Sequence, residues 1–417
     1  MAAELPAEVD VVVVGAGPAG LSAAAELRAL GIARVLVLDR AKEAGGVPRV
    51  CAHSPYGLRE FRRPMWGPAY ARALHNRALA AGSRIVTGVS VSRVLAGPRV
   101  EVTSDETGVT EIAARTILLA TGTRETARPG RFIGGTKPGG VMVTGALQHL
   151  VYDAHQRPFR RPVILGTELV SFSAILTCRH AGIRPAAMIE PGDRITAWRV
   201  ASALPRALGI PLWTGTDVVA VEGTDRVTAV RVRQGGTERR IEADGLVTTG
   251  AFRPEAHLAR LAGLEMDLRT GGPAVDDGGR TSAPAIYAAG NILRPVETAG
   301  WCWRVGRHVA RVIAADLAAT PRPDRMPIAI NGKALKYVVP QYISGADTRA
   351  FDVLQARVKH PVKGRLSVCT GGSEVTARRV NTRPERRLTM DLPRTDTGPI
   401  AVNLEEDARH ADRGALS

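Results

Sequence analysis

The stretch that decides the fold is VDVVVVGAGPAGLSAAAELRALGIARVLVLDR, residues 9–40. It reads as an apolar strand, a glycine-rich turn, an alanine-rich helix, a turn at Gly31 and a second apolar strand. Gly15 permits the tight turn out of the first strand, Gly17 lets a ligand approach the backbone, and Gly20 lets the helix pack on the sheet. This order predicts a β–α–β unit at the start of a parallel sheet.

The glycine-rich turn also predicts a dinucleotide ligand. Unpaired N–H groups at a helix N-terminus bind phosphate, and the helix dipole favours its negative charge. Asp39 ends the second strand, where a carboxylate accepts hydrogen bonds from a ribose diol. The residues expected to contact the dinucleotide in this segment are Gly15, Ala16, Gly17, Pro18, Ala19, Gly20, Asp39, Arg40, Gly45 and Gly46.

Two later stretches indicate which dinucleotide is expected. TILLATGTRE (116–125) is an apolar strand ending in an Ala-Thr-Gly turn, and TSAPAIYAAGNI (281–292) is a short strand ending in Ala-Gly-Asn. With these motifs in this order, the chain resembles the flavoproteins with two dinucleotide-binding domains, which include glutathione and thioredoxin reductases. The resemblance implies bound FAD. The further contacts that it implies are Ala120, Thr121, Gly122, Gly290, Asn291 and Ala299, the last at the start of a helix directed at the flavin. Asn291 replaces the family's Asp, so it keeps its hydrogen bonding and loses the charge.

A second unit of the same type lies between the two FAD segments. RPVILGTELVSFSAILTCRHAGIRPAAMIEP (161–191) reads as strand, turn, helix and strand, and in the family this inserted unit binds NAD(P)H. Its glycine fingerprint is reduced to Gly166, Ser171 and Ala174, and Glu168 stands near the second glycine position, where a carboxylate would repel phosphate. Two alternatives remain open: the unit binds NAD(P)H, or it keeps only the fold. The lost glycine favours the second.

Together these motifs predict an α/β fold with two Rossmann-like, three-layer domains, the second inserted in the first, and a small β-rich C-terminal appendage. The predicted ranges are 1–127 for the first FAD segment, 128–243 for the inserted domain, 244–322 for the second FAD segment and 323–417 for the C-terminal region. The last 20 residues are expected to be frayed.

Three more stretches narrow the resemblance. PGGVMVTGALQ (138–148) is similar to a segment of the α subunits of opine oxidases, proline and hydroxyproline dehydrogenases and hydrogen cyanide synthase. GGVPRVCAHSPYGL (45–58) and INGKALKYVVPQYI (330–343) favour the small flavoproteins encoded beside glycerol-3-phosphate dehydrogenases. This resemblance, over residues 8–345, implies one subunit of a multi-component enzyme whose partner is a second flavoprotein or an electron-transfer subunit.

The four cysteines, Cys51, Cys178, Cys302 and Cys369, lie far apart without a C-x-x-C pair, so no disulfide framework, iron–sulfur cluster or other metal site is expected. In the related proteins the loop holding Cys51 passes near the flavin. Cys51 and His53 could share one face of an extended segment, and an imidazolium would lower the pKa of the thiol. These two are the candidate catalytic residues. The alternatives are a packing role for Cys51 and a dithiol with a distant cysteine.

The composition excludes several other classes of protein. The 417 residues carry a formal net charge of +16, but the basic residues are scattered without a dense basic run, so nucleic-acid binding is not expected. No apolar run reaches the roughly 18 residues of a transmembrane helix. The N-terminus lacks the features of a secretory signal, and few cysteines are present, so a cytoplasmic location is expected.

The sequence therefore predicts an FAD-dependent oxidoreductase, one subunit of a dehydrogenase or oxidase that acts on a small amine, opine or polyol phosphate and passes electrons to a partner. Two alternatives are a stand-alone NAD(P)H-dependent flavin reductase and a non-catalytic subunit that holds FAD in a larger complex. No motif identifies the substrate or a general base.

Overall fold

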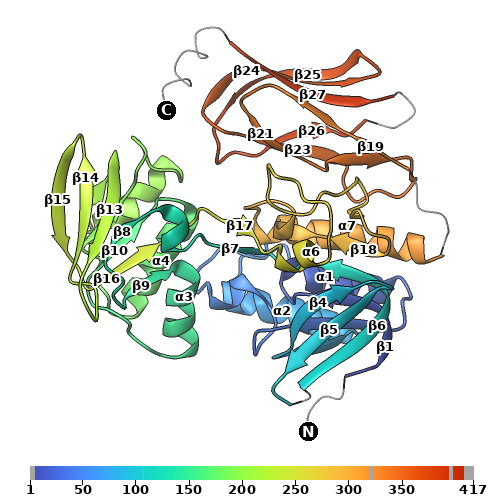
Figure 1. Cartoon of the computed structure of the whole chain (residues 1–417), viewed down its shortest axis with the longest axis horizontal. Helices are drawn as coiled ribbons and strands as arrows, with labels where there is room; N and C mark the ends of the chain where they lie inside the picture. The colour runs from blue at the N-terminus through green and yellow to red at the C-terminus, as the bar shows by residue number, and fades with distance from the viewer. Residues whose placement is uncertain (1–4, 107, 319–323, 394–397, 408–417) are drawn as a thin grey trace.

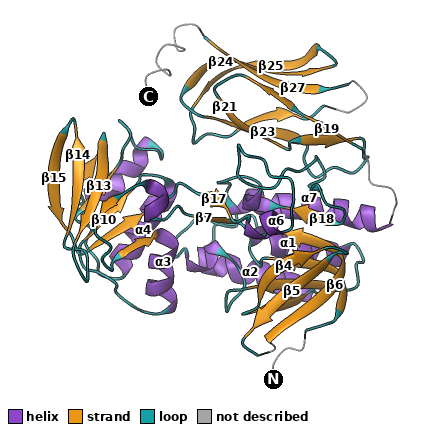
Figure 2. Cartoon of the chain, in the orientation of Figure 1, coloured by secondary structure: helices purple, strands orange, loops and turns teal. Residues whose placement is uncertain are grey.

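The computed structural model describes residues 5–106, 108–318, 324–393 and 398–407. It comprises three parts, which we call the first domain, the inserted domain and the C-terminal domain (Figure 1). Figure 2 shows helices beside the sheets of the first two parts, whereas the C-terminal domain consists of strands and loops. Within these described ranges, no helix combines the length and the apolar content that crossing a bilayer requires.

The first domain is built on a seven-stranded sheet. Its strands are β1 (Glu8–Val14), β2 (Val35–Asp39), β3 (Arg84–Thr87), β4 (Ser90–Leu95), β5 (Arg99–Ser104), β6 (Gly108–Leu119) and β18 (Ile286–Ala288). Its helices are α1 (Pro18–Ala29), α2 (Gly67–Ala80), α6 (His257–Leu261) and α7 (Ala299–Ala318). Strands β3, β2, β1, β6 and β18 pair in parallel, whereas β4 and β5 form an antiparallel extension on the first half of β6.

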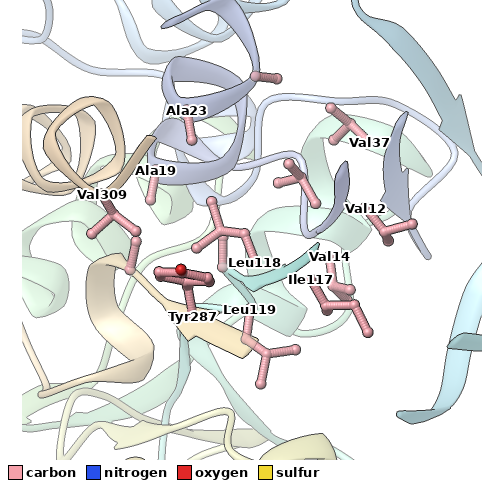
Figure 3. Close-up of a cluster of buried hydrophobic side chains, with 14 of the residues drawn as sticks. Val12, Val14, Ala19, Ala23, Val37, Ile117, Leu118, Leu119, Tyr287 and Val309 are labelled. Atoms are coloured by element: carbon pink, nitrogen blue, oxygen red, sulfur yellow. The ribbon is translucent and has the colours of Figure 1, made fainter. Parts of the chain in front are cut away.

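Parallel strands covered on both faces are apolar along their whole length, which explains the uninterrupted valines of β1. Figure 3 shows Val12 of β1, Ile117 of β6, Ala19 of α1 and Val309 of α7 in the same buried cluster as Tyr287 of β18. The first β–α–β unit thus forms as the sequence predicts, and α7 joins it from the far end of the chain.

Two glycines let the backbones in this cluster approach closely. A Cβ on Gly20 would lie 1.9 Å from the carbonyl oxygen of Gly15, and a Cβ on Gly306 would lie 2.1 Å from that of Ala19. Ser22 of α1 reinforces the second contact, because its hydroxyl donates to the carbonyl of Trp303 on α7 at 2.9 Å. Helix α7 can therefore lie directly against α1 only because Gly306 has no side chain.

The inserted domain contains a parallel sheet and a second, mainly antiparallel sheet. The parallel sheet, in the order β12-β11-β10-β16-β9, consists of β9 (Val141–Val143), β10 (Pro162–Leu165), β11 (Ala187–Ile189), β12 (Leu212–Trp213) and β16 (Gly245–Thr248). The second sheet contains β8 (Gly134–Gly135), β13 (Thr216–Glu222), β14 (Ala229–Gln234) and β15 (Thr237–Glu242). It is antiparallel except for β8, which pairs with β13 in parallel. The helices are α3 (Thr144–Gln148), α4 (Leu169–His180) and α5 (Ala203–Ala207). Separate apolar clusters cover the two faces of the parallel sheet.

The C-terminal domain packs two main sheets on one core. Its strands are β19 (Arg325–Pro327), β20 (Ala329–Asn331), β21 (Leu335–Val339), β22 (Tyr342–Ser344), β23 (Val353–Val358), β24 (Val362–Thr370), β25 (Ser373–Thr382), β26 (Leu388–Asp391) and β27 (Ile400–Glu406). Apolar side chains of the sheets β20-β27-β24-β25 and β21-β23-β26 face each other. In Figure 1 this domain lies over the α7 side of the first domain.

The predicted fold class is confirmed: two Rossmann-like α/β domains with a β-rich C-terminal region. The expectation of a frayed tail is wrong for residues 400–406. They form β27 between β20 and β24, and Ile400, Val402 and Leu404 are buried in strict alternation. Residues 408–417 lie outside the described residues.

The predicted start of the second FAD segment at residue 244 is also corrected. Strand β16 pairs with β10 and β9, so residues 245–248 belong to the sheet of the inserted domain. The chain crosses between the two domains at β7 (Thr123–Arg124) and β17 (Arg253–Pro254), which pair antiparallel. A short apolar strand reads the same in either sheet, so only its pairing partners assign it. The other predicted boundaries stay predictions.

The close approach of α1 and α7 gives a first test. In Gly306→Ala, the new methyl group must displace backbone, and overpacking of this kind costs about 1–3 kcal/mol. We expect the midpoint temperature of unfolding, monitored by protein fluorescence, to be lower than that of the wild type. Gly345→Ala is the matched control, because no atom lies within 4 Å of its Cβ position. Equal midpoints for the two variants would contradict the packing described.

Candidate dinucleotide sites

The turn between β1 and α1 forms an open cradle. Gly15 has a φ of +109°, and a Cβ there would lie 2.5 Å from the carbonyl oxygen of Ala120, so the turn rests on the end of β6. Gly17 precedes α1, and its Cβ position has no atom within 4 Å. No side chain caps the α1 N-terminus. The first N–H groups of α1 are therefore left for an anion, and the space above Gly17 is clear.

Two other segments close around this cradle. A Cβ on Gly46 would lie 2.9 Å from the Cα of Gly17. A Cβ on Gly290 would lie 2.8 Å from the Cβ of Ala19 and 3.8 Å from that of Cys302. The glycine pair at 45–46, the end of β18 and the start of α7 therefore converge on the first turn of α1, although the sequence separates them widely.

The carboxylate of Asp39 is fixed at the edge of the cradle. It accepts the N–H of Ala16 at 2.7 Å through Oδ2 and that of Ala41 at 2.8 Å through Oδ1. A carboxylate has about four lone-pair sites, so acceptor capacity remains for a ribose diol. The side chain of Arg40 is exposed and pairs with Glu255 at 3.9 Å, and its contact with the dinucleotide stays a prediction.

The remaining predicted residues hold backbone segments in place. Thr121 donates its hydroxyl to the carbonyl of Glu255 at 2.6 Å, and Gly122 accepts the N–H of Glu255 at 2.9 Å. The side chain of Asn291 accepts the N–H of Glu297 at 2.8 Å and donates to its carbonyl at 3.1 Å. This pair of bonds closes the loop before Ala299, the first residue of α7. The helix start is where the sequence predicts it.

These features fit FAD. An extended dinucleotide needs bare N–H groups and a glycine for its pyrophosphate and an acid for its ribose, and α1, Gly17 and Asp39 supply them side by side. The individual FAD contacts stay predictions.

The side chains of Cys51 and His53 contact different neighbours. Cys51 follows a 3-10 turn, Val47–Val50, so the predicted extended segment is not formed there. Its side chain is buried, with Sγ 3.8 Å from Oε1 of Gln148, and burial raises the pKa of the thiol. The ring of His53 packs on Tyr56, with 5.5 Å between centroids, and burial lowers its pKa. Both shifts favour the neutral forms, and a catalytic role for the pair stays a prediction.

The equivalent turn in the inserted domain is occupied by a carboxylate. Gly166 retains the positive φ, +118°, that the turn after β10 needs. Glu168 precedes α4, as Gly17 precedes α1, and its Oε1 accepts the N–H of Ala251 at 3.0 Å. The same carboxylate lies 2.3–2.5 Å from the Cβ position of Gly250. The position that Gly17 leaves open in the first domain therefore carries a carboxylate here, and that carboxylate lies against Gly250.

A second carboxylate lies close by and was not expected from the sequence. Glu125 accepts the N–H of Gly145 at 2.8 Å and that of Gly250 at 3.0 Å. Burial raises the pKa of both Glu125 and Glu168, and the nearby Arg131 partly compensates their charge. Glu190 directly follows β11 and corresponds to Asp39 of the first domain, and it accepts the N–H of Gly192 at 2.9 Å. The ribose acid is thus kept, whereas a buried carboxylate stands beside the turn where the first domain has Gly17, an arrangement that disfavours a second dinucleotide.

Known proteins share this arrangement of sequence and fold. The family described as pyridine nucleotide-disulphide oxidoreductase matches residues 9–318. An opine oxidase subunit of Agrobacterium tumefaciens (strain Ach5) is 28% identical over 323 residues, which cover 68% of this chain and 61% of that protein. The alpha subunit of sarcosine oxidase from Corynebacterium sp. (strain P-1) is 32% identical over 269 residues, 60% of this chain and 27% of that protein. The chain thus spans about three fifths of the opine oxidase relative and less of the sarcosine oxidase relative.

The fold has close counterparts among solved structures. The crystal structure of thioredoxin reductase from T. acidophilum superimposes with a TM-score of 0.62 at 22% identity, covering 75% of this chain and all of that one. At this identity the likeness shows the fold alone.

The cradle at Gly17 can be tested by one substitution. Gly17→Glu places a carboxylate where the phosphates are expected, and the clear space means that the chain can still fold. We expect FAD content, measured by absorption near 450 nm and by release on denaturation, to fall at least tenfold, and we expect the uncharged, smaller Gly17→Ala to lose less of it. Full FAD occupancy in Gly17→Glu would refute this placement.

The state of Cys51 can be tested by alkylation. Only the thiolate reacts, and burial raises the pKa of Cys51, so iodoacetamide at pH 8 should modify Cys51 at least tenfold more slowly than the partly exposed Cys369. The rate at Cys51 should increase as the pH rises further. Mass spectrometry of the peptides gives both rates, and urea-unfolded protein, in which they converge, is the control. Faster alkylation of Cys51 at pH 7 would indicate an activated thiolate.

Proposed function

Because the chain belongs to the pyridine nucleotide-disulphide oxidoreductase family, we propose that it is the FAD-holding subunit of an oxidoreductase that oxidises a small amine, opine or polyol phosphate and passes the electrons to a partner subunit. The membership confirms the resemblance found in the motifs and makes the chain an FAD-dependent oxidoreductase. What we propose beyond this membership is the class of substrate and the transfer of electrons to a partner subunit.

The chain's own residues perform the binding and orientation. The bare N–H groups of α1 and the open Gly17 hold the diphosphate, and Asp39 holds the adenosine ribose. The loop closed by Asn291 fixes the start of α7, whose N-terminal N–H groups favour negative charge on the ring system. FAD, when bound, would accept a hydride from the substrate and pass the electrons on.

The position of the Glu168 carboxylate against Gly250 is the observation that favours a partner subunit over NAD(P)H as the electron partner. A second dinucleotide would bring two phosphate charges against two buried carboxylates in a region of low dielectric, where repulsion is strong. Electrons therefore need a route other than a nicotinamide in the inserted domain. The two curated relatives are themselves named as subunits, of an opine oxidase and of a sarcosine oxidase, which supports a partner chain as that route.

The test is a reduction experiment on purified, FAD-loaded protein without oxygen. We expect NADH and NADPH to leave the flavin absorption unchanged over minutes, because neither finds a site, whereas dithionite bleaches it. Rapid bleaching by either nicotinamide would instead favour the stand-alone NAD(P)H-dependent flavin reductase. Protein that folds but never takes up FAD would refute both functions.

Glu168 itself can be varied to show that it is the obstacle. Glu168→Gly removes the carboxylate from above Gly250, and we expect NADH binding, followed by quenching of protein fluorescence, to strengthen at least tenfold. Glu168→Gln keeps the bulk without the charge, so a gain close to that of Glu168→Gly assigns the obstacle to charge, and a much smaller gain assigns it to bulk. Equal, weak binding by all three proteins would place the obstacle elsewhere.

A further inference from the structure

Three guanidinium groups meet where α7 begins under the C-terminal domain. We call Arg294, Arg357 and Arg387 the arginine cluster. Arg294 belongs to the loop before α7, Arg357 to β23, and Arg387 directly precedes β26. Glu297 of the same loop pairs with all three: with Arg294 at 4.0 Å, with Arg357 at 3.4 Å, and with Arg387 in a short contact.

The charges in this cluster do not balance. Glu297 is the one carboxylate in an ion pair with these three cations among the described residues, and Glu168 interacts with Arg357 at longer range, so the cations remain in excess. The side chain of Arg294 is only 1% exposed. Buried cations are costly unless they are paired. Burial and the two neighbouring arginines lower the pKa of Arg387, as expected for an incompletely compensated cation.

The hydrogen-bond donors are also in excess. Arg294 donates to Oε1 of Gln355 at 2.6 Å, and Arg357 donates to the carbonyl of Val296 at 2.6 Å. However, Nε and Nη1 of Arg294 and Nε of Arg357 have no acceptor within the described part of the chain. A buried donor without an acceptor costs about 1–3 kcal/mol. The cluster therefore needs an additional group that accepts hydrogen bonds and carries negative charge.

The cluster is reachable and lies next to the FAD cradle. The side chain of Arg387 is 23% exposed, and its guanidinium carbon lies 3.8 Å from the ring centre of Trp301 in the first turn of α7. Glu297, at the centre of the cluster, is bonded through its backbone to Asn291, and Sγ of Cys302 approaches its carbonyl at 4.0 Å. Because Cys302 also borders Gly290, the loop 291–298 connects the cluster directly to the cradle.

We propose that the arginine cluster binds an anionic group of the substrate, a carboxylate or a phosphate, and that the C-terminal domain thereby completes the substrate site. This inference rests on the proposed function and names its substrate class. The planar fork of a guanidinium matches both anions bidentately. An oxygen ligand would supply the missing negative charge and acceptors, while the part of the substrate to be oxidised extends toward the cradle.

The test is calorimetric titration of the FAD-loaded full chain with inorganic phosphate and, separately, with succinate, at constant ionic strength. We expect one of the two to bind the wild-type protein, and its dissociation constant to rise at least tenfold in Arg387→Gln. Arg379→Gln is the matched control, because Arg379 lies on the same domain, is 78% exposed and pairs with Asp407. It should bind like the wild type. Preference for phosphate indicates a phosphorylated substrate, and preference for succinate indicates a carboxylate.

A second variant distinguishes an anion site from an internal ion-pair network. Glu297→Gln removes the carboxylate that competes for the three cations, so we expect anion binding to strengthen several-fold in protein that retains its FAD. An unchanged or weaker affinity there would argue against the proposal. A wild-type protein that holds FAD but binds neither probe at tens of millimolar overturns the anion site and leaves the proposed function standing. A protein that binds the anion but never takes up FAD would refute the proposed function and leave the anion site standing.

Discussion

The close contact between α1 and α7 is the constraint on which the rest of the structure depends. Gly306 lets the two backbones touch, and this fixes the start of α7 beside the first turn of α1. The loop before α7 then reaches the cradle through Gly290 and Asn291. The same loop carries Glu297, to which the C-terminal domain is bound. One helix packing contact thus places the cofactor cradle, the helix facing it and the third domain relative to one another.

The two α/β domains share a fold, but they carry different residues at the turn where a dinucleotide would bind. Gly17 and Glu168 both precede the helix that follows an inner parallel strand of their sheet, β1 and β10 respectively. Gly17 leaves bare N–H groups with open space, whereas Glu168 fills the space with its own carboxylate over Gly250. The sheets of both domains form with either residue at this position. A Rossmann-like fold alone is therefore no evidence of a bound nucleotide.

Ion pairs are one of the contacts that bind the C-terminal domain to the first domain, together with backbone hydrogen bonds and the apolar side chain of Phe351. Arg357 and Arg387 come from its strands and turns, and both bind Glu297 beneath it. An interface held only for stability would be expected to balance its buried charges, whereas this one retains an excess of cations next to the cradle. The loop 291–298 thus contacts both the C-terminal domain and the cradle.

The sequence by itself determined the first β–α–β unit, because Gly15, Gly17 and Asp39 act through local spacing that can be read directly along the chain. It also indicated that Glu168 opposes a second nucleotide. Only the tertiary structure decided what distant segments do together: β16 joins the inserted sheet through its pairing partners, and Arg357 meets Glu297 across 60 residues. Local patterns specify elements and turns, but the balance of charge at a site depends on which elements the fold brings into contact.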